Sequence, residues 1–259
     1  MTAPLAATRV ELARWRDAGL TLPVWWRDDD AVAPTPALER LLGLAGRLQA
    51  PLHLAVIPAT ATHELADRLS DASGVFVLVH GWQHANHAPP DQKKAEFGPH
   101  RDTETMCAEI ASGRSLLKEI FADQMLPVFT PPWNRLSQDV ADRLGALGFL
   151  ALSTFTPRTA KYAAPGLVQV NTHLDPVAWK SGGGLLDPGL LDAQIARQLE
   201  ARRSGDADNA EPYGLLTHHL VQDDPTWSFT ESIVETLLGS GAARWTPPLH
   251  ECARSRPYA

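Results

Sequence analysis

Cysteine is scarce in this 259-residue sequence, which contains only Cys107 and Cys252. They lie far apart in a chain with no recognisable export signal, and this favours two reduced thiols over a disulfide or a zinc–cysteine site. The sequence also lacks any apolar run approaching 18 residues, so we expect no transmembrane helix and no membrane partner. The N-terminus has no basic start followed by an apolar core, so we expect a cytoplasmic location.

Positive charge is also in deficit. The sequence has 23 lysines and arginines against 30 aspartates and glutamates, a net charge of -7. Without a basic stripe to neutralise phosphates, a nucleic-acid partner is not expected. Neither a Gly-x-Gly-x-x-Gly turn nor a phosphate-binding Gly-x-x-x-x-Gly-Lys motif follows the first apolar run, so a nucleotide cofactor is not expected. No interface signature predicts an oligomeric state.

Short apolar runs alternate with longer amphipathic segments along most of the chain. The amphipathic segments have helical periodicity, and this alternation predicts an α/β fold with a mostly parallel sheet. Seven repeats without a dinucleotide-binding turn favour a closed or nearly closed barrel, in a single domain over residues 1–259. The strands are expected at 22–28, 52–58, 75–80, 126–131, 149–154, 167–172 and 213–218.

The run His80-Gly-Trp-Gln-His84-Ala-Asn-His87 follows the apolar stretch 75–79 directly and has metal-ligand spacing. Histidines at positions i and i+4 would share one face of a helical turn and direct two imidazoles at one ion. A carboxylate to complete such a site is available in the aspartate triplet 28–30, which ends another apolar run. This pairing indicates a metal-dependent hydrolase.

Polar residues collect at the carboxyl ends of the expected strands. Because parallel strands deliver these ends to one mouth of a barrel, their side chains are expected to converge there. Of the neighbours His218 and His219, only one should enter the site, because alternation sends their rings in opposite directions. The polar groups are residues 28–30, His80, 130–135, Thr154, 171–175 and 218–219.

Four of these segments together resemble the polysaccharide deacetylases of carbohydrate esterase family 4, over about residues 22–220. Trp26-Arg27-Asp28-Asp29-Asp30 resembles the family's first motif, Thr-Phe-Asp-Asp-Gly, and His80-Gly-Trp-Gln-His84 its second, His-(Ser/Thr)-x-x-His. Phe129-Thr-Pro-Pro-Trp133 resembles the third, Arg-x-Pro followed by an aromatic residue, and Leu216-Thr-His218 the fifth, Leu-x-His. The best candidate for the fourth motif is Asp175-Pro-Val-Ala-Trp179.

The resemblance implies a distorted (β/α)7 barrel with an Asp-His-His metal site. The functional aspartate pair is either Asp28–Asp29 or Asp29–Asp30, because Asp30 stands where the family has glycine. Family members with an Arg-x-Asp-Asp pattern favour Asp29 as the catalytic base and Asp30 as the metal ligand beside His80 and His84. One divalent ion is implied, Zn²⁺ first, with Co²⁺, Ni²⁺ or Mn²⁺ as alternatives.

The resemblance also assigns the remaining catalytic roles. His218 becomes the general acid, and Arg135 stands in for the arginine that the third motif lacks here. Arg27 is expected to orient the carboxylates through a bidentate ion pair. Trp25 and Trp26 are expected to pack, one inward and one against a helix.

Substrate contacts are expected around the same mouth. Trp82 and Trp133 either stack on a sugar or cap the barrel as core aromatics. The residues expected to bind substrate are Trp82, His87, Pro132, Trp133, Asn171, His173 and Asp175.

The expected reaction is metal-assisted removal of an acetyl or other acyl group from an N-acylated sugar or small amide. The partner would be a small molecule or a soluble carbohydrate. Two alternatives stay open: cleavage of a non-sugar linear or cyclic amide, and a catalytically silent barrel that binds carbohydrate or metal.

Overall fold

The computed structural model describes residues 5–255, so the ends of the predicted 1–259 domain lie outside it and the domain organisation stays a prediction. All seven predicted strands are present: β1 (Leu22–Ala31), β2 (Leu52–Val56), β3 (Val75–His80), β4 (Met125–Thr130), β5 (Ala151–Leu152), β7 (Leu167–Gln169) and β8 (Tyr213–Thr217). The sequence prediction missed two short strands, β6 (Tyr162–Ala164) and β9 (Ala243–Trp245).

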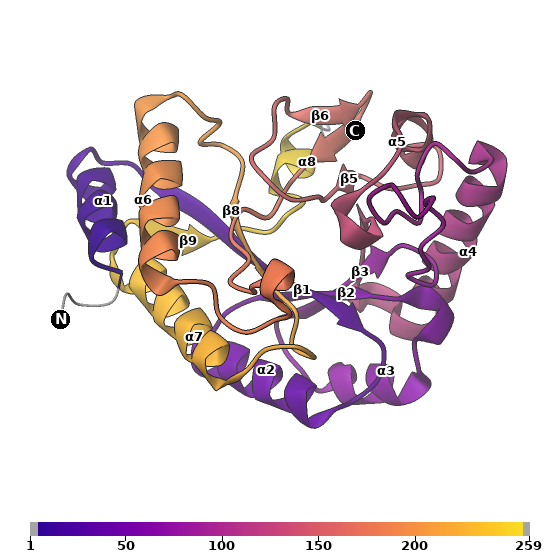
Figure 1. Ribbon diagram of the computed structural model, residues 1–259, viewed down its shortest axis with the longest axis horizontal. Coiled ribbons are helices and arrows are strands. Elements are labelled where there is room, and N and C mark those ends of the chain that lie inside the picture. The colour runs from indigo at the N-terminus through magenta and orange to yellow at the C-terminus, as the bar shows by residue number, and fades with distance from the viewer. Residues whose placement is uncertain (1–4, 256–259) are drawn as a thin grey trace.

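Five of the helices begin after a residue whose side chain caps the first turn. Side chains of Thr35, Thr62, Asp102, Asp187 and Asp223 each accept a hydrogen bond from a backbone N–H of the first turn that follows. Figure 1 shows the helices in an arc outside the sheet, from α1 and α6 through α7, α2 and α3 to α4 and α5. They are α1 (Ala6–Asp17), α2 (Pro36–Arg47), α3 (His63–Ser70), α4 (Thr103–Phe121), α5 (Gln138–Leu144), α6 (Pro188–Ser204), α7 (Asp224–Gly239) and α8 (His250–Ser255).

The sheet is parallel except for one hairpin. Its order is β6-β7-β5-β4-β3-β2-β1-β8, with β9 also paired to β1, and only β6 and β7 run antiparallel. After β7 the chain continues along β5, where Thr172 N donates to Thr154 O, and then reaches β8, where Leu216 N donates to Leu174 O. Residues 170–174 thus join the two sides of the curled sheet, and the predicted distorted barrel is confirmed.

Two apolar clusters follow from the alternation of side chains along the strands. The smaller one, inside the barrel, takes Trp25, Ala55, Leu78, Val128, Ala151, Val168 and Val170. Trp26 faces the other way, into the larger cluster between sheet and helices. The prediction that one tryptophan packs inward and its neighbour against the helices is confirmed.

No helix in residues 5–255 is long and apolar enough to cross a membrane.

Candidate active site

The three aspartates at the end of β1 have three different surroundings. Asp28 accepts hydrogen bonds from Thr217 Oγ1 at 2.6 Å and from the His219 backbone N–H at 3.0 Å, and its carboxylate lies 2.5 Å from His219 Nδ1. Asp29 forms a buried ion pair with Arg27, with 2.9 Å between Oδ1 and Nε. Asp30 Oδ1 lies 3.0 Å from His80 Nε2 and 3.4 Å from His84 Nε2. Since Asp28 is engaged by His219, Asp29 and Asp30 are the pair left facing the mouth.

The histidines are brought together by a strand end and a loop. His80 is the last residue of β3, and its Nδ1 donates to Thr130 O at 2.9 Å, so that Nε2 is directed at Asp30. Residues 81–87 form no helix, so the predicted helical turn is wrong. Instead, a backbone with φ of 62° at Gly81 and 55° at His84 turns the second imidazole back towards Asp30.

Glu96, which the sequence analysis missed, anchors this loop. Its fully buried carboxylate accepts hydrogen bonds from the backbone N–H groups of Trp82 at 3.2 Å and Gln83 at 2.9 Å, and a longer one from Ala85 at 3.4 Å. A Cβ atom at Gly81 would lie 2.3 Å from Glu96 Oε2, so glycine is required there for contact as well as for φ. An acidic residue between the apolar Ala95 and Phe97 was the only signal in the sequence.

Asp30, His80 and His84 form a group of possible metal ligands whose donor atoms all lie within 4.8 Å of one another. One carboxylate oxygen and two imidazole nitrogens are a donor set that zinc and similar divalent ions accept. Three protein ligands also leave coordination positions for water or substrate. The three residues therefore fit the implied ion.

The ionisation of two of these three groups, Asp30 and His84, suits metal binding. Burial opposes a charged Asp30, but the hydrogen bond with His80 and the positive charge of nearby histidines outweigh it and lower the pKa of Asp30. Burial and the neighbouring His80 lower the pKa of His84. For His80, burial is outweighed by the carboxylates of Asp29 and Asp30, which raise its pKa. An anionic Asp30 and a neutral His84 are the forms that coordinate a metal.

Arg27 holds the predicted base in place, as the sequence analysis expected. Its guanidinium pairs with both oxygens of Asp29 and donates to Ser153 Oγ at 2.7 Å and to Asn134 Oδ1 at 2.8 Å. Arg135 is elsewhere: its Nη1 donates to Lys94 O at 2.7 Å. The prediction that Arg135 replaces the arginine missing from the third motif needs correction. The arginine that pairs with Asp29 is Arg27, two residues earlier in the chain.

His218 lies beside the candidate fourth motif. Its Nδ1 is 3.8 Å from Asp175 Oδ2, which accepts a hydrogen bond from Trp179 Nε1 at 2.8 Å. The Trp179 ring meets the His218 ring edge-on at 4.7 Å. Burial raises the pKa of Asp175, although His218 opposes this. The His219 ring instead turns to Asp28, so the two rings point in different directions, and the entry of His218 alone into the site stays a prediction.

Apart from Asp175, which lies beside His218, the predicted substrate-binding residues divide into two groups, and the first lies around His84. Trp133 contacts the His84 ring at 4.4 Å and is partly exposed, whereas Trp82 packs against the large apolar cluster. Pro132 is buried against the Gly81 turn, and His87 is exposed. Trp133 is therefore better placed than Trp82 to meet a ligand.

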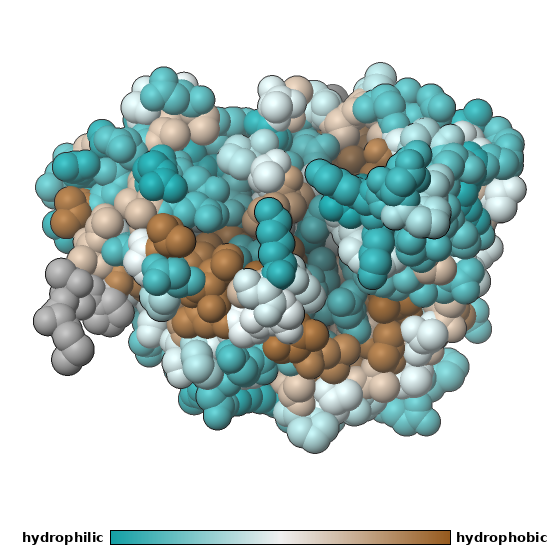
Figure 2. Space-filling view, viewed as in Figure 1, coloured by the Kyte–Doolittle hydropathy of each residue, from teal (hydrophilic) through white to brown (hydrophobic). Residues whose placement is uncertain are grey.

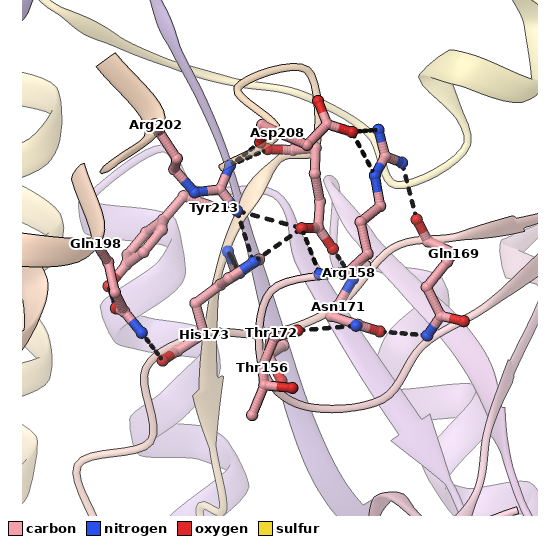
Figure 3. A network of polar contacts seen from close by, with 12 residues as sticks. Thr156, Arg158, Gln169, Asn171, Thr172, His173, Gln198, Arg202, Asp208 and Tyr213 are labelled. Carbon is pink, nitrogen blue, oxygen red and sulfur yellow. Dashed lines mark hydrogen bonds and ion pairs between the residues drawn. The ribbon is translucent and has the colours of Figure 1, made fainter. Parts of the chain in front are cut away.

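The second group, Asn171 and His173, belongs to the polar network of Figure 3. His173 is fully buried: Nε2 is bound to Glu211 at 3.1 Å, and Nδ1 accepts the Gly214 N–H at 2.9 Å. Burial lowers the pKa of His173 to about 4, so its ring is neutral. Both ring nitrogens are used, and the predicted contact of His173 with substrate needs correction to a structural role. Asn171 is buried too, but it lines a cavity together with Thr154, Thr156 and Gln169.

Backbone strain is concentrated around the same mouth. Four residues other than glycine with positive φ are Asp30 (73°), His84 (55°), Trp133 (55°) and Asn134 (56°). Such conformations cost about 1–3 kcal/mol each and cluster at functional sites. Their coincidence with the possible metal ligands is independent support for a functional site here.

No protein-family model matches this chain, and no curated protein matches it. Solved structures do. A suspected polysaccharide deacetylase from Mycobacterium smegmatis is similar with a TM-score of 0.60 at 16% identity, covering 91% of this chain and 93% of the other. A family 4 acetyl xylan esterase from Clostridium thermocellum, in complex with a cobalt ion, has a TM-score of 0.52 at 14% identity, covering 90% of each chain.

A third similar structure is a pseudoenzyme of the same esterase family from Bacillus anthracis. Its TM-score is 0.53 at 12% identity, with 86% of this chain and 63% of the other covered. The same fold thus occurs with and without activity, and identities this low establish the fold alone. The chain has the fold of the polysaccharide deacetylases of carbohydrate esterase family 4, and the resemblance found in its sequence is confirmed at that level.

Proposed function

We propose that this protein is a metal-dependent hydrolase that removes an acyl group, acetyl first among them, from an N-acylated sugar or a related small amide. The observation that carries the proposal is the placing of three groups at one mouth: the Asp30–His80–His84 cluster, the Arg27–Asp29 pair and His218. Each group matches a role that amide hydrolysis requires.

The cluster Asp30, His80 and His84 would hold the ion, and Zn²⁺ is the first choice for two imidazoles and one carboxylate. A divalent metal bound there supplies Lewis acidity, which lowers the pKa of a bound water and polarises a carbonyl. Co²⁺, Ni²⁺ and Mn²⁺ suit the same donors.

The chain's own residues handle the protons. Arg27 pairs with both oxygens of Asp29 and fixes the carboxylate in position to accept a proton from the attacking water. His218 donates a proton to the departing amine, which could not leave as an anion. Asp175 and Trp179 hold the His218 ring in place.

The test begins with elemental analysis of the purified protein and its His80→Ala/His84→Ala double variant. About one transition metal per chain, lost in the variant, is the expected result. His63→Ala removes an exposed histidine outside the cluster and should keep the metal. A double variant that retains wild-type metal would overturn the proposed site.

The second step is assay of the metal-loaded protein on N-acetylated sugars and on non-sugar amides and cyclic ureides. Release of acetate from sugars supports the proposal. Turnover of non-sugar amides alone would move the substrate to the second class. Metal binding without turnover of either class would identify a silent barrel, the state represented by the pseudoenzyme of the same fold.

A further inference from the structure

A basic rim borders the candidate active site on the side of His84, although the net charge of the chain is -7. The rim consists of Lys93 and Lys94, in the loop between β3 and α4, and of Arg135, which follows the short turn η3 (Pro132–Asn134). Within residues 5–255, none of these three side chains forms an ion pair with a carboxylate. Figure 2 shows hydrophilic side chains over this loop, at the edge of a central hollow. The chemistry proposed above uses none of the three cations.

Lys94 is linked to the candidate metal site through one aromatic ring. Its ammonium lies over the Trp133 ring, with 5.9 Å between Nζ and the ring centroid. The same ring contacts the His84 ring, with 4.4 Å between the two centroids. These two contacts separate the ammonium from a possible metal ligand, and a single sugar unit with one substituent can cover that span. A molecule whose acyl group lies at the metal site can therefore present a second group to Lys94.

The turn that carries Trp133 is fixed at both ends. Asn134 Oδ1 accepts a hydrogen bond at 2.8 Å from Arg27, the arginine that holds the proposed base. The next residue, Arg135, donates from Nη1 to Lys94 O at 2.7 Å. Trp133 and Asn134 have positive φ, 55° and 56°. Backbone strain held in this way is typical of ligand sites, and here it sets the position of the rim relative to the reaction centre.

A cavity of about 570 Å³ lies between the loop and the turn, within the range of small-molecule sites. The residues that line it include Gln92, Lys93, His100, Asn134 and Arg135. Its lining contains no aspartate or glutamate. The amide of Gln92 and the imidazole of His100 can add N–H donors to the positive charges. An oxyanion is the group that such a lining suits, because N–H donors and cations both favour it and no carboxylate repels it.

The acidic residues of the same loop do not neutralise the rim. Residues 81–101 include two, Asp91 and Glu96. Glu96 is buried and accepts hydrogen bonds from backbone N–H groups of the loop. Asp91 is exposed and lies outside the cavity lining. The rim thus keeps its positive charge for a ligand, but three cations are too few for a polyanion such as a nucleic acid.

We propose that the basic rim binds an anionic group of the substrate, a phosphate or a carboxylate, on the same molecule as the acyl amide. The substrate is then an N-acylated sugar or related amide that carries one oxyanion. This inference rests on the proposed function, because that function places the acyl group at Asp30, His80 and His84.

The first test compares kcat/KM of the metal-loaded protein for N-acetylglucosamine, for its 1- and 6-phosphates, and for an N-acetylated amino sugar with a carboxylate. One or two charge-assisted hydrogen bonds predict that an anionic sugar is preferred about 10- to 100-fold over the uncharged one. The preference should fall as salt is added, because Lys93 and Lys94 are exposed. The anionic sugar that is preferred identifies the group as phosphate or carboxylate. Equal turnover of all these sugars would overturn the rim and leave the proposed function standing.

The variant Lys93→Gln/Lys94→Gln removes two of the three charges and keeps polar side chains. The ratio of kcat/KM for the anionic and the uncharged sugar should fall about 10-fold or more. The matched control is Lys180→Gln, which removes an exposed lysine beside Trp179, outside the cavity lining, and should keep the wild-type ratio. An unchanged ratio in the double variant, or an equal fall in Lys180→Gln, would show that the preference does not come from the rim.

A binding measurement separates the two proposals where no hydrolysis occurs. Glucose 1-phosphate, glucose 6-phosphate and glucuronate, which have no acyl amide, are titrated into the wild-type protein and followed by calorimetry. Binding that Lys93→Gln/Lys94→Gln loses and His80→Ala/His84→Ala keeps would support the rim even if the proposed reaction fails. Binding lost only in the histidine variant would place the anion at the metal site and overturn the rim. No binding, together with no preference for an anionic sugar, would overturn it too.

Discussion

Three consecutive aspartates do three different things in this fold, and substitution can separate them. Asp28→Asn removes the charge buried beside His219 and should lower the free energy of unfolding by about 3 kcal/mol, while metal content stays at the wild-type value. Asp29→Asn should keep the metal but lower kcat by about 100-fold or more, because it removes the carboxylate that we propose as the proton acceptor. Metal analysis, steady-state kinetics and denaturant titration measure the three quantities.

Asp29→Asn also leaves the buried Arg27 without a counter-ion, so some loss of stability is expected with the loss of turnover. Retained metal is the evidence that its site is still formed. The opposite pattern, with metal lost in Asp29→Asn and turnover lost in Asp28→Asn, would make Asp28 the base and Asp29 the ligand.

Asp30, His80, His84 and Arg27 could be predicted from the sequence, because each lies within a short motif whose order and spacing are local features of the chain. The sequence left the aspartate pair open because the choice depends on His219, which is 191 residues from Asp28 in the chain. Arg135 was expected to replace the arginine missing from the third motif, because it lies in the same segment of the sequence, residues 130–135. Alternation along β1 alone could not show whether Arg27 packs in the core or pairs with a carboxylate. The structure shows that Arg27 points inward and is the arginine that contacts Asp29.

At the scale of elements, the path of the loop from Gly81 to Glu96 determines whether His84 lies beside His80 and Asp30. Glu96→Gln replaces one acceptor oxygen with an NH₂ group that faces backbone donors, so the loop should lose its fixed path. Outer-shell partners of metal ligands are worth about 10- to 100-fold in affinity, and we expect a loss of that size. Competition with a chelator measures it, using Zn²⁺ as the probe.

Asp102→Asn is the control for that change. Asp102 also accepts a hydrogen bond from a backbone N–H, at the start of α4, but does not touch the histidine loop. The metal affinity of the Asp102→Asn variant should equal that of the wild-type protein. If Glu96→Gln were equally unaffected, Glu96 would be only a packing residue and His84 would be held by its other contacts.

Elements with a sustained sequence pattern were predictable, and two short strands without one were not. α2, α4 and α6 have helical periodicity or cap signals, and β1 to β4 have sustained apolar runs. β6 and β9 are three residues each, and β6 pairs with β7 across a turn that includes Gly166 with φ of 76°. β5 and β7 are as short, but they lie within the longer predicted strands 149–154 and 167–172, whereas β6 and β9 have no such surrounding pattern and depend on their pairing partners.

At the scale of the whole molecule, the seven strand–helix repeats predicted a barrel. The segment that joins the two sides of its sheet, however, is not part of any repeat. Residues 170–174 first run beside β5 and then hydrogen-bond to β8. The polar network around Glu211 supports them. Glu211 binds both the Asn171 N–H and His173. Buried polar groups of this kind are satisfied by partners distant in sequence, which explains why Asn171 and His173 looked like site residues.

The buried histidines also set how the molecule responds to acid. His53 is 2% exposed, lies against the Trp25 and Phe76 rings, and has Nδ1 2.9 Å from Trp26 O. Burial lowers its pKa from 6.5 to about 4, although the hydrogen bond to Trp26 opposes this. Folded His53 is therefore neutral where the unfolded chain is already protonated. Its contribution to stability is complete above pH 6.5 and is lost as the pH falls towards 4.

His53→Asn tests this effect, because the asparagine amide can still donate to Trp26 O but does not titrate in this range. The variant should be less stable than the wild-type protein at pH 7.5, since it loses the ring contacts. That deficit should shrink by about 3 kcal/mol between pH 6.5 and pH 4, because the wild-type protein alone must keep a histidine unprotonated at this position. Urea unfolding at several pH values measures the difference, and a deficit that stays constant with pH would show that His53 has the same pKa in the folded and unfolded states.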